Sequence, residues 1–251
     1  MPVGSSRKFH VHLHNKKNSS LSKMKSKKQN TLSKSGFIRS LQCLKSLYLY
    51  KNFYKLRDMP SKELLERFRQ GTAIGRLAWQ LFPNGVDLSP GSAFPSAITK
   101  AAIKTSEQLL SDNIVIYEAS FIYQPTLTIL DILVKENGRL FAYEVKSSVE
   151  ISETYIRDMA FQYFVMNKAG YCPERFSIVH LKEGYDSTSN SIDCFRITDV
   201  TNEILSLQDF IIENVDCAIK AMKDDSLLGI QQGEHCHNPY LCDFWGYCSK
   251  Q

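Results

Sequence analysis

An acid inside an apolar stretch, followed along the chain by a Glu-x-Lys motif, is the pattern with the clearest chemical potential. Asp131 interrupts a run of isoleucine, leucine and valine, and Glu144 and Lys146 follow it. A carboxylate buried in a strand is costly unless it binds a metal ion or pairs with a cation. Two converging carboxylates and the backbone carbonyl of Val145 suit Mg²⁺ or Mn²⁺, which prefer oxygen ligands. Lys146 could then activate an attacking water or stabilise charge developing on a phosphate.

Two strands joined by a tight turn must bring these residues together. Residues 126–134 are rich in β-branched side chains, and residues 140–146 form a second apolar segment. The pair Asn137-Gly138 between them is a strong signal for a hairpin. The sequence therefore predicts antiparallel neighbours whose two acids face each other.

Flanking residues extend this predicted site. Glu118 follows a predicted strand at 114–117 and could add a third carboxylate, or it could be an exposed acid at a strand end. A predicted helix over 152–168 carries Tyr155, Asp158 and Gln162 on one face. This stripe either faces the site and orients the lysine or is simply solvated.

A simpler interpretation also fits the Glu-x-Lys motif. Glu144 and Lys146 could form an ion pair on an exposed strand edge, because such motifs are common. The acid on the preceding strand, in the hairpin register, favours the catalytic interpretation.

The seven cysteines are unevenly distributed. Cys236, Cys242 and Cys248 crowd the end of the sequence, and the others are scattered. Because no signal peptide is visible, such a cluster indicates a metal site more than disulfides. The three cysteines in otherwise apolar segments are predicted to be core thiols: Cys172, Cys194 and Cys217.

The remaining pattern predicts a mixed α/β core with an N-terminal helical portion. Helices are expected over 36–57, from 61 to before 71, 72–82, 95–111 and 201–222, and further strands over 175–182 and 192–198.

Composition separates the first 30 residues from the rest. They hold eight cations and no acid, whereas the remaining 221 residues hold 23 cations and 26 acids. Residues 1–30 are therefore predicted to be a disordered basic leader, either a solvated extension or a weak phosphate tether. No apolar run is long enough to span a membrane, and the expected compartment is the cytoplasm.

The site residues resemble the RecB-like branch of the PD-(D/E)XK nucleases, in which an acid, Asp131, Glu144-Val145-Lys146 and a helix bearing Gln162 follow in this order. The segments Leu32–Leu49, Gly75–Val86 and His235–Cys248 look like one RecB-like family of uncharacterised function. The resemblance implies a restriction-endonuclease-like core with a C-terminal cysteine-rich metal-cluster segment. Residues 31–251 would form one nuclease domain that includes the 232–251 tail.

The same resemblance implies a metal-dependent DNA nuclease, acting on single-stranded ends, with a 4Fe–4S cluster. As in CRISPR-associated and AddB-type nucleases, one cysteine before the core and three after it would hold the cluster: Cys43, Cys236, Cys242 and Cys248. A partner protein could supply a helicase or a second nuclease activity.

The sequence also departs from the pattern of better-known relatives. It has no histidine at Gly75-Arg76, Met166 replaces a tyrosine, and the tail cysteines are separated by five residues each. Zinc, with His235 or His237 as a ligand, is the main alternative to the cluster, and free thiols are another. A nucleic-acid-binding or redox-sensing module without catalysis is the alternative function.

Overall fold

The computed structural model describes residues 31–250. The predicted basic leader, residues 1–30, lies outside the described part, as does residue 251. No helix of residues 31–250 is long and apolar enough to cross a membrane.

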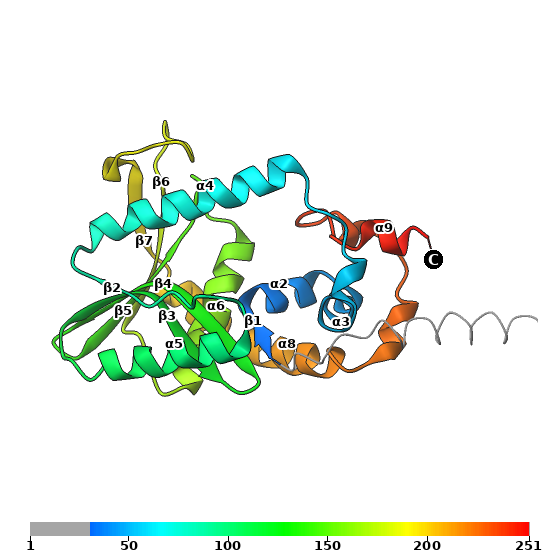
Figure 1. Cartoon of the computed structure of the whole chain (residues 1–251), viewed down its shortest axis with the longest axis horizontal. Helices are drawn as coiled ribbons and strands as arrows, with labels where there is room; N and C mark the ends of the chain where they lie inside the picture. Colours follow the sequence, from blue (N-terminus) through cyan, green and yellow to red (C-terminus); the bar gives the residue numbers. More distant parts are fainter. Residues whose placement is uncertain (1–30, 251) are drawn as a thin grey trace, which may run out of the picture.

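A mixed sheet of seven strands forms the centre of the described chain (Figure 1). The strands are β1 (Leu32–Ser33), β2 (Val86–Asp87), β3 (Ile114–Tyr123), β4 (Thr126–Glu136), β5 (Arg139–Val145), β6 (Arg175–Leu181) and β7 (Phe195–Asp199). Their order is β2-β3-β4-β5-β6-β7, and β1 pairs with β4 outside this path. β3, β4 and β5 are successive antiparallel neighbours, whereas β5 and β6 are parallel. The predicted α/β class is confirmed.

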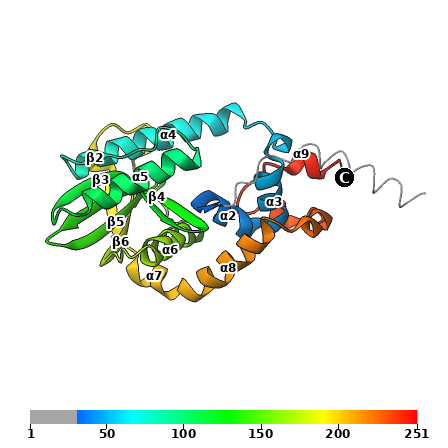
Figure 2. The ribbon, with the colours of Figure 1, turned by 60° about the horizontal axis from the view of Figure 1, so that its bottom comes forward.

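Helices cover both faces of this sheet (Figure 2). They are α2 (Lys34–Gln42), α3 (Leu44–Asn52), α4 (Lys62–Ala78), α5 (Pro95–Gln108), α6 (Glu153–Lys168), α7 (Thr201–Ser206), α8 (Gln208–Ala221) and α9 (Trp245–Cys248). One core cluster joins α2, α6 and α8 to the sheet, with Phe37 stacked on Phe161 at 4.7 Å between ring centroids. A second cluster packs Ile74 and Ala78 of α4 against Ile132 and Val179 on the opposite face.

The predicted hairpin is present. β4 ends at Glu136 and β5 begins at Arg139, so the loop consists of Asn137 and Gly138 alone. Both loop residues have positive φ, 50° and 78°, as a type I′ turn requires. The resulting register pairs Ile132 with Tyr143.

Three predicted helix boundaries are wrong. The helix expected over 36–57 is two helices, because Cys43 has an extended backbone (φ −163°, ψ 118°) and separates α2 from α3. The helix expected to end before Gly71 continues to Ala78 and absorbs much of the separate helix expected over 72–82, because burial of Ile74 and Ala78 outweighs the weak helix propensity of glycine. The helix expected over 201–222 is interrupted at Leu207, between α7 and α8.

Candidate active site

The site lies where β4 and β5 separate. The ladder between them stops at the pair of Ile132 and Tyr143, and Val145 donates its backbone N–H to Oδ2 of Asp131 at 2.7 Å. At the first residues of β4, the neighbouring strand is β1 instead of β5, and Leu32 pairs with Thr126. The two strands therefore form a fork, and the chain that leaves β1 enters α2 beside it.

Three acids are aligned across the sheet at this fork. In the ladder of β3 and β4, Glu118 lies opposite Asp131. One pair beyond the last pair of β4 and β5, Glu144 lies opposite Asp131 on its other side. Glu118 has a left-handed backbone, with φ of 57°, which costs free energy in a residue other than glycine. Burial, and then the nearby Glu144 carboxylate, raise the pKa of Glu118, although Lys34 opposes this.

Glu144 is buried, and both of its oxygens are occupied. Oε1 accepts hydrogen bonds from Nζ of Lys146 (2.7 Å) and Nζ of Lys34 (2.6 Å). Oε2 accepts one from Nε2 of Gln162 (2.8 Å), whose own Oε1 is held by the Thr128 hydroxyl (3.2 Å). Burial alone would raise the pKa of Glu144, but the two ammonium groups more than offset it and hold the pKa at about 2.

Lys146 follows β5 directly and is fixed at both ends. Its backbone N–H donates to the carbonyl of Val179 (2.8 Å), and its ammonium bridges Glu144 and Oδ2 of Asp158, each at 2.7 Å. The ammonium also lies 5.2 Å from the centre of the Tyr155 ring. Burial would lower the pKa of Lys146, but the two carboxylates raise it well above the ordinary value, so this side chain is an ammonium ion.

The α6 stripe therefore faces the site rather than solvent. Tyr155, Asp158 and Gln162 come from successive turns of the helix that Ser152 caps. Gln162 orients Glu144, and Asp158 orients Lys146. Asp158 and Gln162 are both buried, so the solvated alternative does not hold for them.

Lys34 is the member of the site that sequence reasoning missed. It is the first residue of α2, and its ammonium lies 2.6 Å from Oε1 of Glu144 and 3.9 Å from Oδ2 of Asp158. No spacing rule connects residues 34 and 144. One signal was available, because a lysine in the first helical turn, with no acid in that turn, is unfavourable for the helix and needs an outside partner.

Asp131 is the carboxylate for which the metal-free site offers least stabilisation. Burial, and then the charge of Glu144, raise its pKa to about 7 even though Lys34 and Lys146 lie nearby. A cation placed against this carboxylate would favour its charged form. The oxygens of Asp131 and Glu144 and the carbonyl of Val145 are the hard donors that Mg²⁺ or Mn²⁺ takes.

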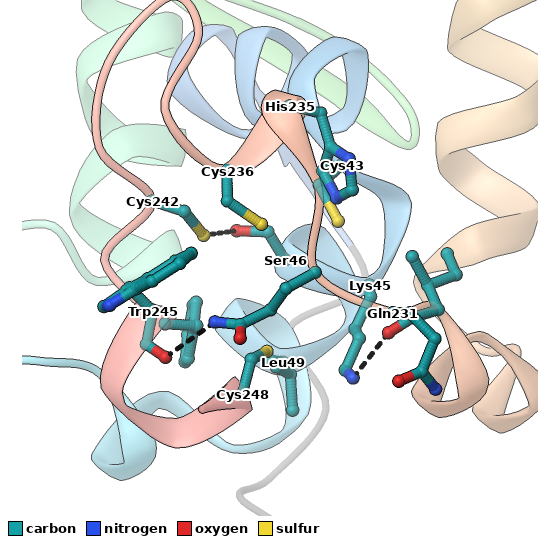
Figure 3. Close-up of a pocket in the computed structure, with 13 residues that line it drawn as sticks. Cys43, Lys45, Ser46, Leu49, Gln231, His235, Cys236, Cys242, Trp245 and Cys248 are labelled. Carbon is teal, nitrogen blue, oxygen red and sulfur yellow. Dashed lines mark hydrogen bonds between the residues drawn. The ribbon is translucent and has the colours of Figure 1, made fainter. Parts of the chain in front are cut away.

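The predicted cysteine ligands gather far from the sheet, beside α3 (Figures 1 and 3). Cys43, Cys236, Cys242 and Cys248 line one pocket, and all four are free thiols. Burial raises the pKa of Cys43 and Cys248, and the neighbouring thiols add to the rise in both. His235 lines the same pocket.

Side chains of α2 and α3 hold the C-terminal segment over this pocket. Arg39 forms two hydrogen bonds with the carboxylate of Asp243. Gln42 donates to the carbonyls of His235 (2.9 Å) and Tyr240 (2.6 Å), and Lys45 donates to a carbonyl of the segment before η5 (Glu234–Cys236) at 2.8 Å.

Neither group of residues forms a ready-made metal site. In the described chain, no three histidine, cysteine, aspartate or glutamate side chains converge closely enough to hold a metal ion. At the fork the proposed donor set is two carboxylates and one carbonyl, with Glu118 beside it. At the pocket, four thiols are a donor set that suits an iron–sulfur cluster or zinc.

The prediction that the other three cysteines are core thiols is wrong for two of them. Cys194 is buried, but Cys172 and Cys217 are exposed. Cys172 lies in the loop after α6, with its sulfur 3.3 Å from the Tyr163 hydroxyl, and Cys217 lies on α8.

Comparison with known proteins gives only distant likenesses. No protein-family model and no curated protein matches the chain. Among solved structures it is similar to a protein designated SSO0001, with 13% identity and a TM-score of 0.31, over 86% of this chain and 95% of that one. It is also similar to an alkaline exonuclease (LHK-Exo) from Laribacter hongkongensis, with 11% identity and a TM-score of 0.27, over 62% of this chain and 96% of that one. At these scores the likenesses carry no functional argument, which must come from the site.

Proposed function

We propose that the chain is a metal-dependent nuclease that hydrolyses phosphodiester bonds at the fork between β4 and β5. The observation that carries this proposal is that Asp131, Glu144 and Lys146 lie in one cluster around the buried Glu144, with the two acids on neighbouring strands and the lysine bonded to Glu144. Such a cluster is costly to bury for stability alone. Its oxygen donors and its ammonium match what phosphodiester hydrolysis needs, which is metal binding and neutralisation of developing charge.

The roles follow from the contacts. Asp131, Glu144 and the carbonyl of Val145 would hold Mg²⁺ or Mn²⁺, which would supply an activated water and a counter-charge to the phosphate. Gln162 keeps Glu144 in place through its hydrogen bond to Oε2. Lys146, whose ammonium Glu144 and Asp158 hold in place, would stabilise negative charge developing on the phosphate.

The proposed substrate is nucleic acid. A preference for DNA, and for single-stranded ends, rests on the resemblance to RecB-like nucleases, as does a partner with helicase or second nuclease activity. Glu118, which shares the row of Asp131, would add a third carboxylate near the metal.

We also propose a structural 4Fe–4S cluster at Cys43, Cys236, Cys242 and Cys248. Supporting this is the convergence of two chain segments, nearly two hundred residues apart, on one thiol-lined pocket. Protein purified without oxygen should be brown and contain iron and sulfide, and Cys43→Ser should lose both while Cys172→Ser keeps them. A colourless wild-type protein that contains stoichiometric zinc would refute the cluster and support a zinc site at this pocket.

Cleavage of labelled single-stranded DNA with Mg²⁺ or Mn²⁺ tests the nuclease proposal. Lys146→Ala should reduce the rate by roughly 100-fold or more, as does loss of a group that stabilises transition-state charge. Lys135→Ala is the matched control, because Lys135 lies at the far end of the same hairpin and donates to the carbonyl of Leu109. Equal rates for Lys146→Ala and wild type would refute the assignment, and metal-independent binding without cleavage would favour a non-catalytic module.

A further inference from the structure

The Lys34 ammonium lies beside two acids of the site, 2.6 Å from Oε1 of Glu144 and 3.9 Å from Oδ2 of Asp158. We propose that its ammonium holds the place of the divalent metal ion on Glu144, is displaced when the ion binds, and then serves as a contact for substrate phosphate. This inference rests on the proposed metal site but concerns a residue to which the proposed mechanism gives no role.

The hydrogen bonds of the cluster fill one carboxylate oxygen of Glu144. Oε1 accepts from both Lys34 and Lys146, whereas Oε2 accepts from Gln162. Asp131 uses Oδ2 to accept the backbone N–H of Val145. A divalent ion that binds Oε1 therefore requires one of its two lysine donors to leave.

Among the three donors to Glu144, Lys34 has the weakest contacts with other groups. Lys146 is fixed by a second bond to Asp158 at 2.7 Å, whereas Lys34 approaches Asp158 only to 3.9 Å. Gln162 is fully buried and has a further partner in Thr128. The side chain of Lys34 is also the most exposed of the basic groups here, at 26% against 17% for Lys146, and it projects from the end of a helix.

Charge repulsion favours the same exchange. The Lys34 ammonium and a divalent ion on Glu144 carry charges of the same sign, and like charges held side by side in a partly buried site disfavour each other. Ion binding and release of the lysine are therefore coupled.

A released ammonium stays close to the fork. It is tethered to the first residue of α2 by a flexible four-carbon stem, and it lies at the solvent side of the site. In a working complex a phosphate of the bound strand would lie within its reach, and an ammonium forms a charge-assisted hydrogen bond with a phosphate. The same lysine thus weakens metal binding and strengthens substrate binding.

Calorimetric titration with Mn²⁺ tests the competition directly. Lys34→Met should bind Mn²⁺ roughly tenfold more tightly than wild type, because Lys34 then no longer competes for Oε1 of Glu144. Lys182→Met is the control, since Lys182 follows the end of β6 and its ammonium donates to the carbonyl of Asp193, and the affinity of this variant should match wild type. Equal or weaker binding by Lys34→Met would overturn the inference while leaving the proposed function intact, whereas no Mn²⁺ binding by wild type would overturn both.

Chemical labelling provides a test that needs no substitution. Acetic anhydride should modify Lys34 slowly in EDTA and several-fold faster in Mg²⁺, whereas Lys146 should stay protected in both, as peptide mass spectrometry would show. Equal labelling of Lys34 in both conditions would contradict displacement.

The contact with substrate predicts an effect of opposite sign. With Ca²⁺ in place of Mg²⁺, Lys34→Met should bind single-stranded DNA about fivefold more weakly than wild type although it binds the metal more tightly. Lys34→Arg should restore DNA binding, since it keeps the positive charge. A purely structural role would weaken both interactions together, and that result would refute the phosphate contact.

Discussion

Replacing Asp131 with asparagine should stabilise the metal-free protein while it destroys the proposed metal site. The carboxylate of Asp131 is half-buried beside Glu144, and its pKa is raised to about 7, first by burial and then by Glu144. The backbone N–H of Val145 donates to Oδ2 of Asp131, and the amide oxygen of asparagine can accept this hydrogen bond equally well. The substitution therefore removes an unfavourable charge and keeps the local contact.

The size of the effect follows from the shift in pKa. The unfolded carboxyl loses its proton near pH 3.8, whereas the folded one keeps its proton to about pH 7. Between these values the folded state binds more protons than the unfolded state, so the stability of the wild type falls as pH rises. At about 1.4 kcal/mol per pH unit, the loss above pH 7 is at most about 4 kcal/mol, and structural relaxation will reduce it. Asparagine does not titrate, so its advantage should be small near pH 4 and reach about 2–4 kcal/mol above pH 7.

Urea unfolding in EDTA at pH 5 and pH 8 measures this difference. At pH 8 the unfolding free energy of Asp131→Asn should exceed that of wild type, and its melting temperature should be higher by roughly 5 °C or more. Mn²⁺ should then stabilise the wild type and leave the variant unchanged. A variant less stable than wild type at pH 8, or an advantage of equal size at both pH values, would refute the reasoning.

Three further substitutions have outcomes set by single contacts. Asp158→Asn should lower the unfolding free energy by about 2–4 kcal/mol in the same urea assay, because it leaves the buried Lys146 ammonium without one of its two carboxylates. Glu118→Asn should keep or raise stability by about 0.5–1 kcal/mol, since asparagine tolerates positive φ better, and a loss of stability would argue against strain there. Gly85→Ala should destabilise by about 1–3 kcal/mol in thermal melts because its Cβ would lie 2.3 Å from the Tyr117 ring, whereas Gly91→Ala, with open space around it, should not.

Much of the hairpin that carries the site was predictable because its signals are local. The Asn137-Gly138 pair determines a two-residue turn, and a two-residue turn determines which residues of the flanking strands are opposite each other. That register places Asp131 beside Glu144. The i, i+3, i+7 spacing on α6 likewise placed Asp158 and Gln162 on one face without any knowledge of the sheet.

The parts that sequence reasoning missed depend on contacts between distant segments. Lys34 reaches Glu144 across 110 positions only because β1 pairs in parallel with the far end of β4. A strand of two residues carries no periodicity, so β1 gave no signal of its own. The break at Cys43 and the continuation of α4 through Gly71 are decided by packing, which outweighs the local preferences that end helices.

Helix α2 connects the two candidate sites, yet its packing should keep them energetically separate (Figure 2). Lys34 begins the helix and Cys43 follows its last residue, so the two lie roughly 13 Å apart along the axis at 1.5 Å per residue. Between them Phe37 is fully buried and stacks on Phe161 of α6, the helix that also carries Gln162. Loosening of the cysteine pocket must disrupt this stack before it can move Lys34. Cys43→Ser should therefore lower stability and metal content at the pocket but leave the calorimetric affinity for Mn²⁺ within about twofold of wild type, and a larger change would show that the stack transmits the disturbance.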